Sequence, residues 1–369
     1  MSRRGVTVRF AGAAVCLFLA VILLEFSGAG MVSVRTPLDG YKYVLVSILF
    51  LACAYLFVSA LARLQGEPRG LLSVDGGTVL AGSGSSALQR LGSRTSASII
   101  ATWVFLALSL MFTLLLVTDP LTFTGMAQEG GFIETASAAM SFLSFFILII
   151  ASVRIWRTGN PARVRYLIPA VLLVLYFFVM GMEEVSWFQR VLGYETPALL
   201  AGNSQGEINL HNYDTLQSFN AYFITAFMFL LLFPFLRDLT GILRSSRVAR
   251  LFTPNVYIVM MGAIAGAFNY KLWGFASVQL SFFASIFILM FYARRAERNR
   301  SLVIAVMLGC LAIQAMIALS GSGLEGSQAT GDFRDVSEYR EFLTPLAFLF
   351  YSLEVLSRTR RRDLRPARP

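Results

Sequence analysis

The chain has 369 residues, of which 56% are hydrophobic and 14% charged, and its mean hydropathy is +0.67. Soluble domains are about half apolar and a quarter charged, so this composition excludes an ordinary soluble domain and indicates a protein of the lipid bilayer. The formal net charge of +10 does not indicate a nucleic-acid partner, because the basic residues stand in short clusters between long apolar runs, as membrane topology signals do.

Ten apolar segments are long enough, or nearly so, to cross a bilayer as helices, which takes about 20 residues each. They cover 9–30, 42–63, 97–118, 132–153, 166–183, 219–237, 254–273, 275–293, 301–320 and 339–357. The predicted fold is therefore an all-α, polytopic transmembrane bundle of about ten spans. The boundary at 273/275 requires a tight turn; without it, 254–293 becomes one span plus a re-entrant segment.

The distribution of charge predicts the orientation of these spans. With alternate loops assigned to opposite sides, 25 of the 31 Lys and Arg residues fall on one side and 6 on the other. Cytoplasmic loops attract Lys and Arg, so both termini are predicted to be cytoplasmic, and the protein is expected in the cell (inner) membrane. Of the 21 acidic residues, 14 fall on the predicted outer side.

Composition also divides the chain into parts. Residues 1–63 form a two-span unit, and the Gly- and Ser-rich segment 64–96 is typical of a flexible cytoplasmic linker. An eight-span core covers 97–357, and a basic cytoplasmic tail covers 358–369. The outer loop 184–218 within the core mixes apolar and charged residues, so it is predicted to be ordered and folded against the outer ends of neighbouring spans.

Carboxylates gather at the outer ends of three spans. Glu134 opens the fourth span, Glu183 and Glu184 close the fifth, and Asp335 and Glu338 open the tenth. Ionisable groups at membrane depth are costly and normally pair or line a wet cavity, so these residues are candidates for catalytic groups. The alternative is that they are simply solvated helix ends.

A second candidate element is the tract 203–214. If it is helical, Glu207 and His211 lie one turn apart on one face, which suits metal ligation or acid–base chemistry. Alternatively, Ser204 and Glu207 form a capping box that only starts a helix. His211 is the sole histidine, which excludes a histidine-rich zinc site, so a cation held by Glu184, Glu207 and His211 would be magnesium, manganese or calcium.

Two segments of this loop carry a resemblance. E-E-V-S-W-F-Q-R from Glu183 and Q-G-E-I-N-L-H-N from Gln205 resemble the E-E-x-S-W-x-Q-R... Q-G-E-x-N-x-H-N signature of an uncharacterised group of bacterial multi-pass membrane proteins. The resemblance covers about 30 residues. It implies a shared site in the outer loop but no particular reaction, because no activity is known for the group.

Together these features favour a hydrolase or transferase that acts at the outer face on a lipid or lipid-linked glycan. Membrane lipid and a lipid-linked substrate are the expected partners, and no nucleic acid is. A transporter or lipid flippase is the alternative, for which charged groups on broken helices near the midplane are typical. A non-catalytic assembly or sensor component is the third hypothesis.

Overall fold

The computed structural model describes residues 85–128, 131–196, 208, 216–240, 246–269, 276–296, 299–324 and 334–359. Of these, only the backbone is described for 85–96, 190–191, 216–221, 276–277, 321–324 and 334–335. Within these ranges the chain is helical and contains no strand, as the sequence predicted. The first two predicted spans, Glu207, His211 and most of the basic tail lie outside the described residues.

Among the described residues, six helices are long and apolar enough to cross a membrane. They are Ala97–Thr118 within α4 (Ser85–Thr118), α6 (Phe132–Trp156), α7 (Arg163–Glu184), Tyr222–Thr240, Val278–Arg295 within α13 (Ala276–Arg295) and Arg300–Ser320 within α14 (Arg300–Leu324). Each coincides with a predicted span, so the chain is a multi-pass membrane protein. α4 begins at Ser85 and so extends into the segment predicted as a linker.

The span Tyr222–Thr240 is not a uniform α-helix. It consists of the end of α9 (Leu216–Phe227), the π-helical turn η3 (Met228–Leu232) and α10 (Phe233–Thr240). Such π-turns inside α-helices are frequent at functional sites. η3 packs directly on α12 (Val256–Ala265), where Leu230 and Leu231 adjoin Gly262.

α12 shows that the prediction of a complete helical span over 254–273 is wrong. The helix has only 10 residues, about 15 Å of rise against a hydrocarbon core of about 30 Å. It begins where the Asn255 side chain accepts from the amides of Tyr257 and Ile258, at 2.9 and 3.1 Å. Every residue from Tyr257 to Ala265 is buried, as expected of a helix that is apolar on all sides.

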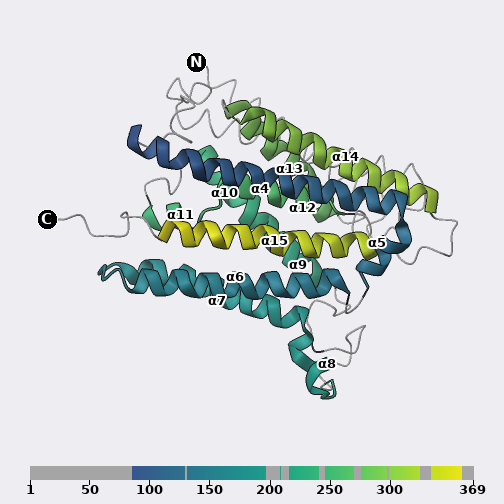
Figure 1. Ribbon diagram of the computed structural model, residues 1–369, viewed down its shortest axis with the longest axis horizontal. Coiled ribbons are helices and arrows are strands. Elements are labelled where there is room, and N and C mark those ends of the chain that lie inside the picture. The colour runs from purple at the N-terminus through teal and green to yellow at the C-terminus, as the bar shows by residue number, and fades with distance from the viewer. Residues whose placement is uncertain are drawn as a thin grey trace, which may run out of the picture.

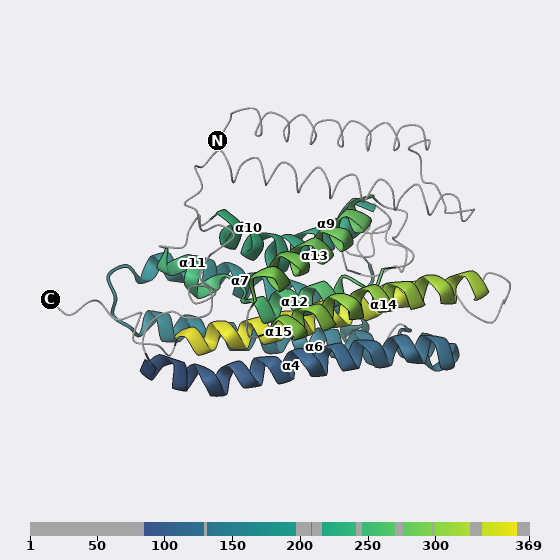
Figure 2. The same ribbon diagram turned by 90° about the horizontal axis from the view of Figure 1, so that it is seen from above.

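The last helix, α15 (Arg334–Thr359), forms the centre of the bundle. It lies between α4 and α6 in Figure 1, and Figure 2 shows α9, α10 and α13 on one side of α12 and α15 with α4 on the other. Side chains at spacings of four, from Tyr339 through Leu343, Ala347 and Tyr351 to Val355, are completely buried. α15 contains the predicted span 339–357 but carries several charges, so it is not among the six apolar helices.

α15 packs in parallel against α6 along a narrow seam of mostly small residues. The seam residues of α6 recur every three or four positions and are all buried: Ser137, Ser141, Ser144, Leu148, Ala151 and Ile155. Small side chains allow close approach of helices in a bilayer. Arg154 Nη1 donates to the Leu356 carbonyl at 3.5 Å and Ser137 Oγ to that of Glu341 at 3.4 Å, so the two helices share one direction.

Arginines gather at one end of the bundle, to the left in Figure 1, where α6, α10, α13 and α15 end and α7, α11 (Arg247–Phe252) and α14 begin. They are Arg154, Arg163, Arg237, Arg247, Arg250, Arg294, Arg295, Arg300 and Arg358. This arginine-rich end is the end predicted to be cytoplasmic. Among the described residues, Glu134, Glu183, Glu184, Glu338 and Glu341 lie at or near the opposite end.

Candidate membrane-embedded polar site

A buried arginine marks the polar centre of the bundle. Arg340 of α15 is 3% exposed and lies two turns from the start of its helix, about 9 Å along it. Its guanidinium carbon is 3.2 Å from the centre of the Phe223 ring on α9, and its Nη1 donates to Asn269 Oδ1. A charge at this depth is costly, so the groups that compensate it point to function.

Asn269 joins three helices just beyond the end of α12. Its side-chain amide donates to the Gly266 carbonyl at the end of α12. Its backbone carbonyl accepts from Gln314 Nε2 of α14 at 3.0 Å. Its Oδ1 is the acceptor for Arg340. A helix that ends inside a membrane must satisfy its free carbonyls with protein groups, and Asn269 does this here.

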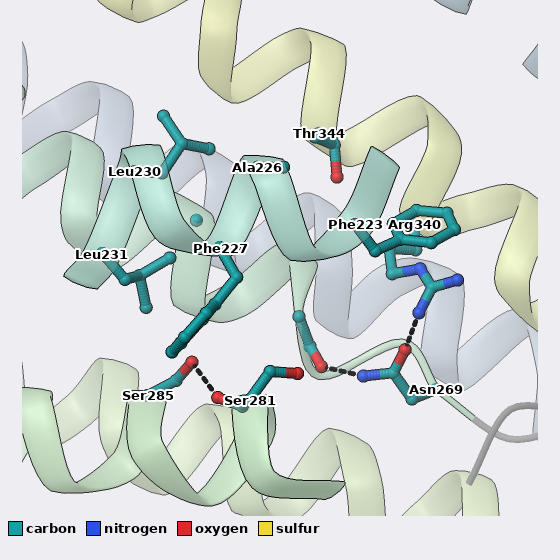
Figure 3. A pocket seen from close by; sticks show the side chains of 12 residues that line it. Phe223, Ala226, Phe227, Leu230, Leu231, Asn269, Ser281, Ser285, Arg340 and Thr344 are labelled. Atoms are coloured by element: carbon teal, nitrogen blue, oxygen red, sulfur yellow. Dashed lines mark hydrogen bonds between the residues drawn. The ribbon is translucent and has the colours of Figure 1, made fainter. Parts of the chain in front are cut away.

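A cavity of about 40 Å³ lies beside this junction (Figure 3). Arg340, Asn269, Ser281, Ser285 and Thr344 supply its polar groups, and the side chains of α9 and η3 supply most of its apolar wall. A water molecule needs about 10–15 Å³, so the cavity is large enough for a few waters or a small polar group. It therefore combines a buried cation with space.

Charged groups of two other helices, α7 and α15, are within electrostatic range of the Tyr222 hydroxyl of α9. They are Glu184 on α7 and Glu341 and Arg340 on α15, and the Tyr176 hydroxyl of α7 is within this range as well. Arg340 is likewise within electrostatic range of Glu341 and Glu338. Glu184 and Arg340 are thus both within electrostatic range of Tyr222.

Two buried carboxylates end α7. Glu183 and Glu184 are 6% and 8% exposed. The Trp187 indole Nε1 donates to Glu183 Oε1 at 2.8 Å, and the Tyr194 hydroxyl donates to the Trp187 carbonyl at 2.6 Å. These bonds fix the chain directly after the acidic pair.

The backbone after the pair is strained. Ser186, Trp187 and Phe188 have φ values of +46°, +53° and +60°, a left-handed conformation that costs about 1–2 kcal/mol per residue for side chains other than glycine. Such strain persists only where surrounding contacts impose it, and it occurs most often at functional sites. Three strained residues in succession therefore single out this turn.

The next residue, Gln189, fastens the outer loop. Its Nε2 donates to Thr196 Oγ1 at 2.8 Å, and its Oε1 accepts from the Ile208 amide at 2.6 Å. The described parts of the loop predicted as ordered, 184–196 and 208, are thus held together. Ile208 directly follows Glu207, whose own placement lies outside the described residues.

The other predicted site residues have different surroundings. Glu134 is half-buried in the first turn of α6, and Glu338 is half-buried on α15. Asp335 lies in the first turn of α15, and its side chain is outside the described set. Within the described ranges, no three acidic, histidine or cysteine side chains are grouped to hold a metal. The predicted cation site with Glu207 and His211 remains a prediction.

Sequence reasoning missed Arg340, Asn269, Tyr222 and Tyr176. Arg340 stands between Glu338 and Glu341, so it resembles one more charge of an aqueous helix end. Asn269 lies within the predicted span 254–273, near its end, and a polar residue inside a predicted span was a usable signal.

In comparisons with known proteins, no family model, curated protein or solved structure matches the chain.

Proposed function

We propose that the protein is a membrane enzyme, a hydrolase or transferase, that acts on a lipid or lipid-linked substrate at the end of the bundle opposite the arginine-rich end. By the positive-inside rule this end is the outer face. The observation that carries the proposal is the buried acidic pair at the end of α7, which is followed by the strained turn 186–188. Glu184 of this pair and Arg340 are both within electrostatic range of Tyr222.

The chemistry follows from the residue types. A carboxylate held out of water near a tyrosine hydroxyl is a typical general acid or base, and an adjacent guanidinium stabilises negative charge as it develops. Glu184 is the acid–base group, because it is within electrostatic range of the Tyr222 hydroxyl. Glu183 accepts a hydrogen bond from the Trp187 indole and so positions the turn. The site lies among transmembrane helices and no soluble domain covers it in the described ranges, so a substrate with a membrane anchor suits it.

The test is turnover of membrane lipids by the full chain in nanodiscs. The protein is incubated with a total membrane lipid extract, and the products are identified by mass spectrometry. Glu184→Gln is expected to abolish product formation while the protein remains folded. Glu195→Gln is the matched control, since Glu195 is an exposed carboxylate in the loop just after α8 (Gln189–Leu192). Equal activity of wild type and Glu184→Gln would refute the catalytic role of Glu184.

A lipid flippase or transporter is the second candidate, and α12 favours it. A half-length helix that ends beside a buried arginine resembles the discontinuous helices that form transporter binding sites. Fluorescent lipid exchange between the leaflets of proteoliposomes distinguishes the two functions. Exchange without any new lipid product would favour transport, whereas products without exchange would favour the enzyme.

A further inference from the structure

We propose that Arg340 binds the anionic phosphate group of a ligand in the cavity at the end of α12, where the group competes with Asn269 for the guanidinium. The inference deepens the proposed function, on which it rests for the idea of a lipid substrate, by naming the substrate's anionic group. It concerns binding and not turnover, so the two can fail separately.

The first reason is that Asn269 and a phosphate differ in strength as hydrogen-bond partners of Arg340. Asn269 is a neutral amide and offers Arg340 one oxygen. A phosphate offers several charged oxygens and can bind a guanidinium through two parallel hydrogen bonds, which are roughly twice as strong as bonds to neutral groups. A phosphate that reaches this point therefore displaces the amide.

The second reason is the geometry of the cavity. Arg340 and Asn269 line the same space, together with the Ser281 and Ser285 hydroxyls of α13 (Figure 3). Both hydroxyls now donate to carbonyls of their own helix, and each can rotate to donate to an incoming oxygen. At about 40 Å³ the cavity admits phosphate oxygens only when the Asn269 side chain turns away.

The nearby carboxylates do not occupy this position. Glu341 is one residue and Glu338 two residues from Arg340 along α15, and side chains at these spacings do not share a face of a helix. Both carboxylates are within electrostatic range of Arg340. Arg340 and Asn269 line the cavity, whereas neither Glu338 nor Glu341 is among the described residues that line it.

Binding of the phosphate group would also change how the end of α12 is held. Asn269 ties the end of α12 to α15 through Arg340 and to α14 through Gln314. Displacement of its side chain removes the first tie and leaves the second. The ligand's phosphate therefore changes how the end of α12 is held, which links occupancy of the site to the discontinuous helix.

The experiment measures binding to the purified full-length chain by microscale thermophoresis. The probes are dihexanoyl phosphatidylglycerol, the zwitterionic dihexanoyl phosphatidylcholine and inorganic phosphate. We expect phosphatidylglycerol to bind more tightly than phosphatidylcholine. Arg340→Lys, which keeps the charge but loses the paired hydrogen bonds, should weaken binding about tenfold. Inorganic phosphate that binds with the same dependence on Arg340 would support the site and identify a free anion as its ligand.

Two further variants make the test decisive. Asn269→Ala removes the competitor and should bind the same probe at least about threefold more tightly. Arg295→Lys is the matched control, because Arg295 also stacks on an aromatic ring, that of Phe291 at 4.0 Å, but at the arginine-rich end. Absence of binding by every probe, equal losses in Arg340→Lys and Arg295→Lys, or weaker binding by Asn269→Ala would each overturn the proposal.

Discussion

Arg358 of α15 fastens the end of α11 to its own helix, and its replacement gives a quantitative test of the fold. Its Nη1 donates to the carbonyls of Arg250, Leu251 and Thr253 at 3.1, 2.9 and 2.7 Å, and its Nη2 pairs with Glu354. The two side chains are 18% and 13% exposed. Removal of one partner from a buried ion pair costs about 3–5 kcal/mol, because the other charge is left uncompensated.

We therefore expect Arg358→Met to lower the free energy of unfolding by about 3 kcal/mol, the low end because both side chains retain some contact with solvent. Glu354→Gln in the same chain removes the uncompensated charge and should recover about half of the loss. The assay is titration with SDS in mild detergent, followed by tryptophan fluorescence. Arg163→Met, which removes only an exposed hydrogen bond and stacking on Trp156, should cost less than about 1 kcal/mol. A loss under 1 kcal/mol in Arg358→Met, or no recovery in the double variant, would refute the reasoning.

Further predictions concern packing, a buried hydrogen bond and topology. Gly262→Val should lower the free energy of unfolding by about 1–3 kcal/mol in the same titration, because an added Cβ would lie 2.8 Å from Leu231 Cδ1. Gly266→Ala should leave it nearly unchanged, because no atom lies closer than 3.5 Å to the added Cβ. Tyr292→Phe should lower the free energy of unfolding by about 1–2 kcal/mol, because the Tyr292 hydroxyl donates to the buried Asp238 carboxylate at 2.9 Å. Tyr194→Phe should lower it less, because Tyr194 is exposed. Equal losses in the two variants would contradict this prediction. Reporter fusions after residues 157 and 250 should report the cytoplasm and a fusion after Thr196 the outside. The reverse result would overturn the assignment of the site to the outer face.

The sequence predicted six apolar helices correctly because length and hydropathy alone decide whether a segment can cross a bilayer. The same criterion failed for α12. Residues 254–268 are apolar almost throughout, so hydropathy cannot tell that the helix ends at Ala265; that end depends on partners from elsewhere in the chain, Gln314 and Arg340.

The candidate site was predictable only in part. Glu183 and Glu184 stood out because an acidic pair ends an apolar span, and both are buried. The left-handed turn that follows them could not be predicted, since Ser-Trp-Phe contains none of the residues, Gly, Asn or Asp, that usually mark positive φ. Arg340 was unrecognisable for a related reason: its burial depends on the Phe223 ring and Asn269, which are distant in sequence.

The central claim is that Glu184 and Arg340 belong to one functional site, and their combined substitution tests it most directly. Lipid turnover in nanodiscs is measured for wild type, Glu184→Gln, Arg340→Lys and the double variant. Residues that act as a unit give losses that do not add, so the double variant should be no less active than the worse single variant. If the fold-losses of activity in the two single variants multiply in the double variant, the two residues act independently. Full activity in Glu184→Gln would contradict the claim altogether.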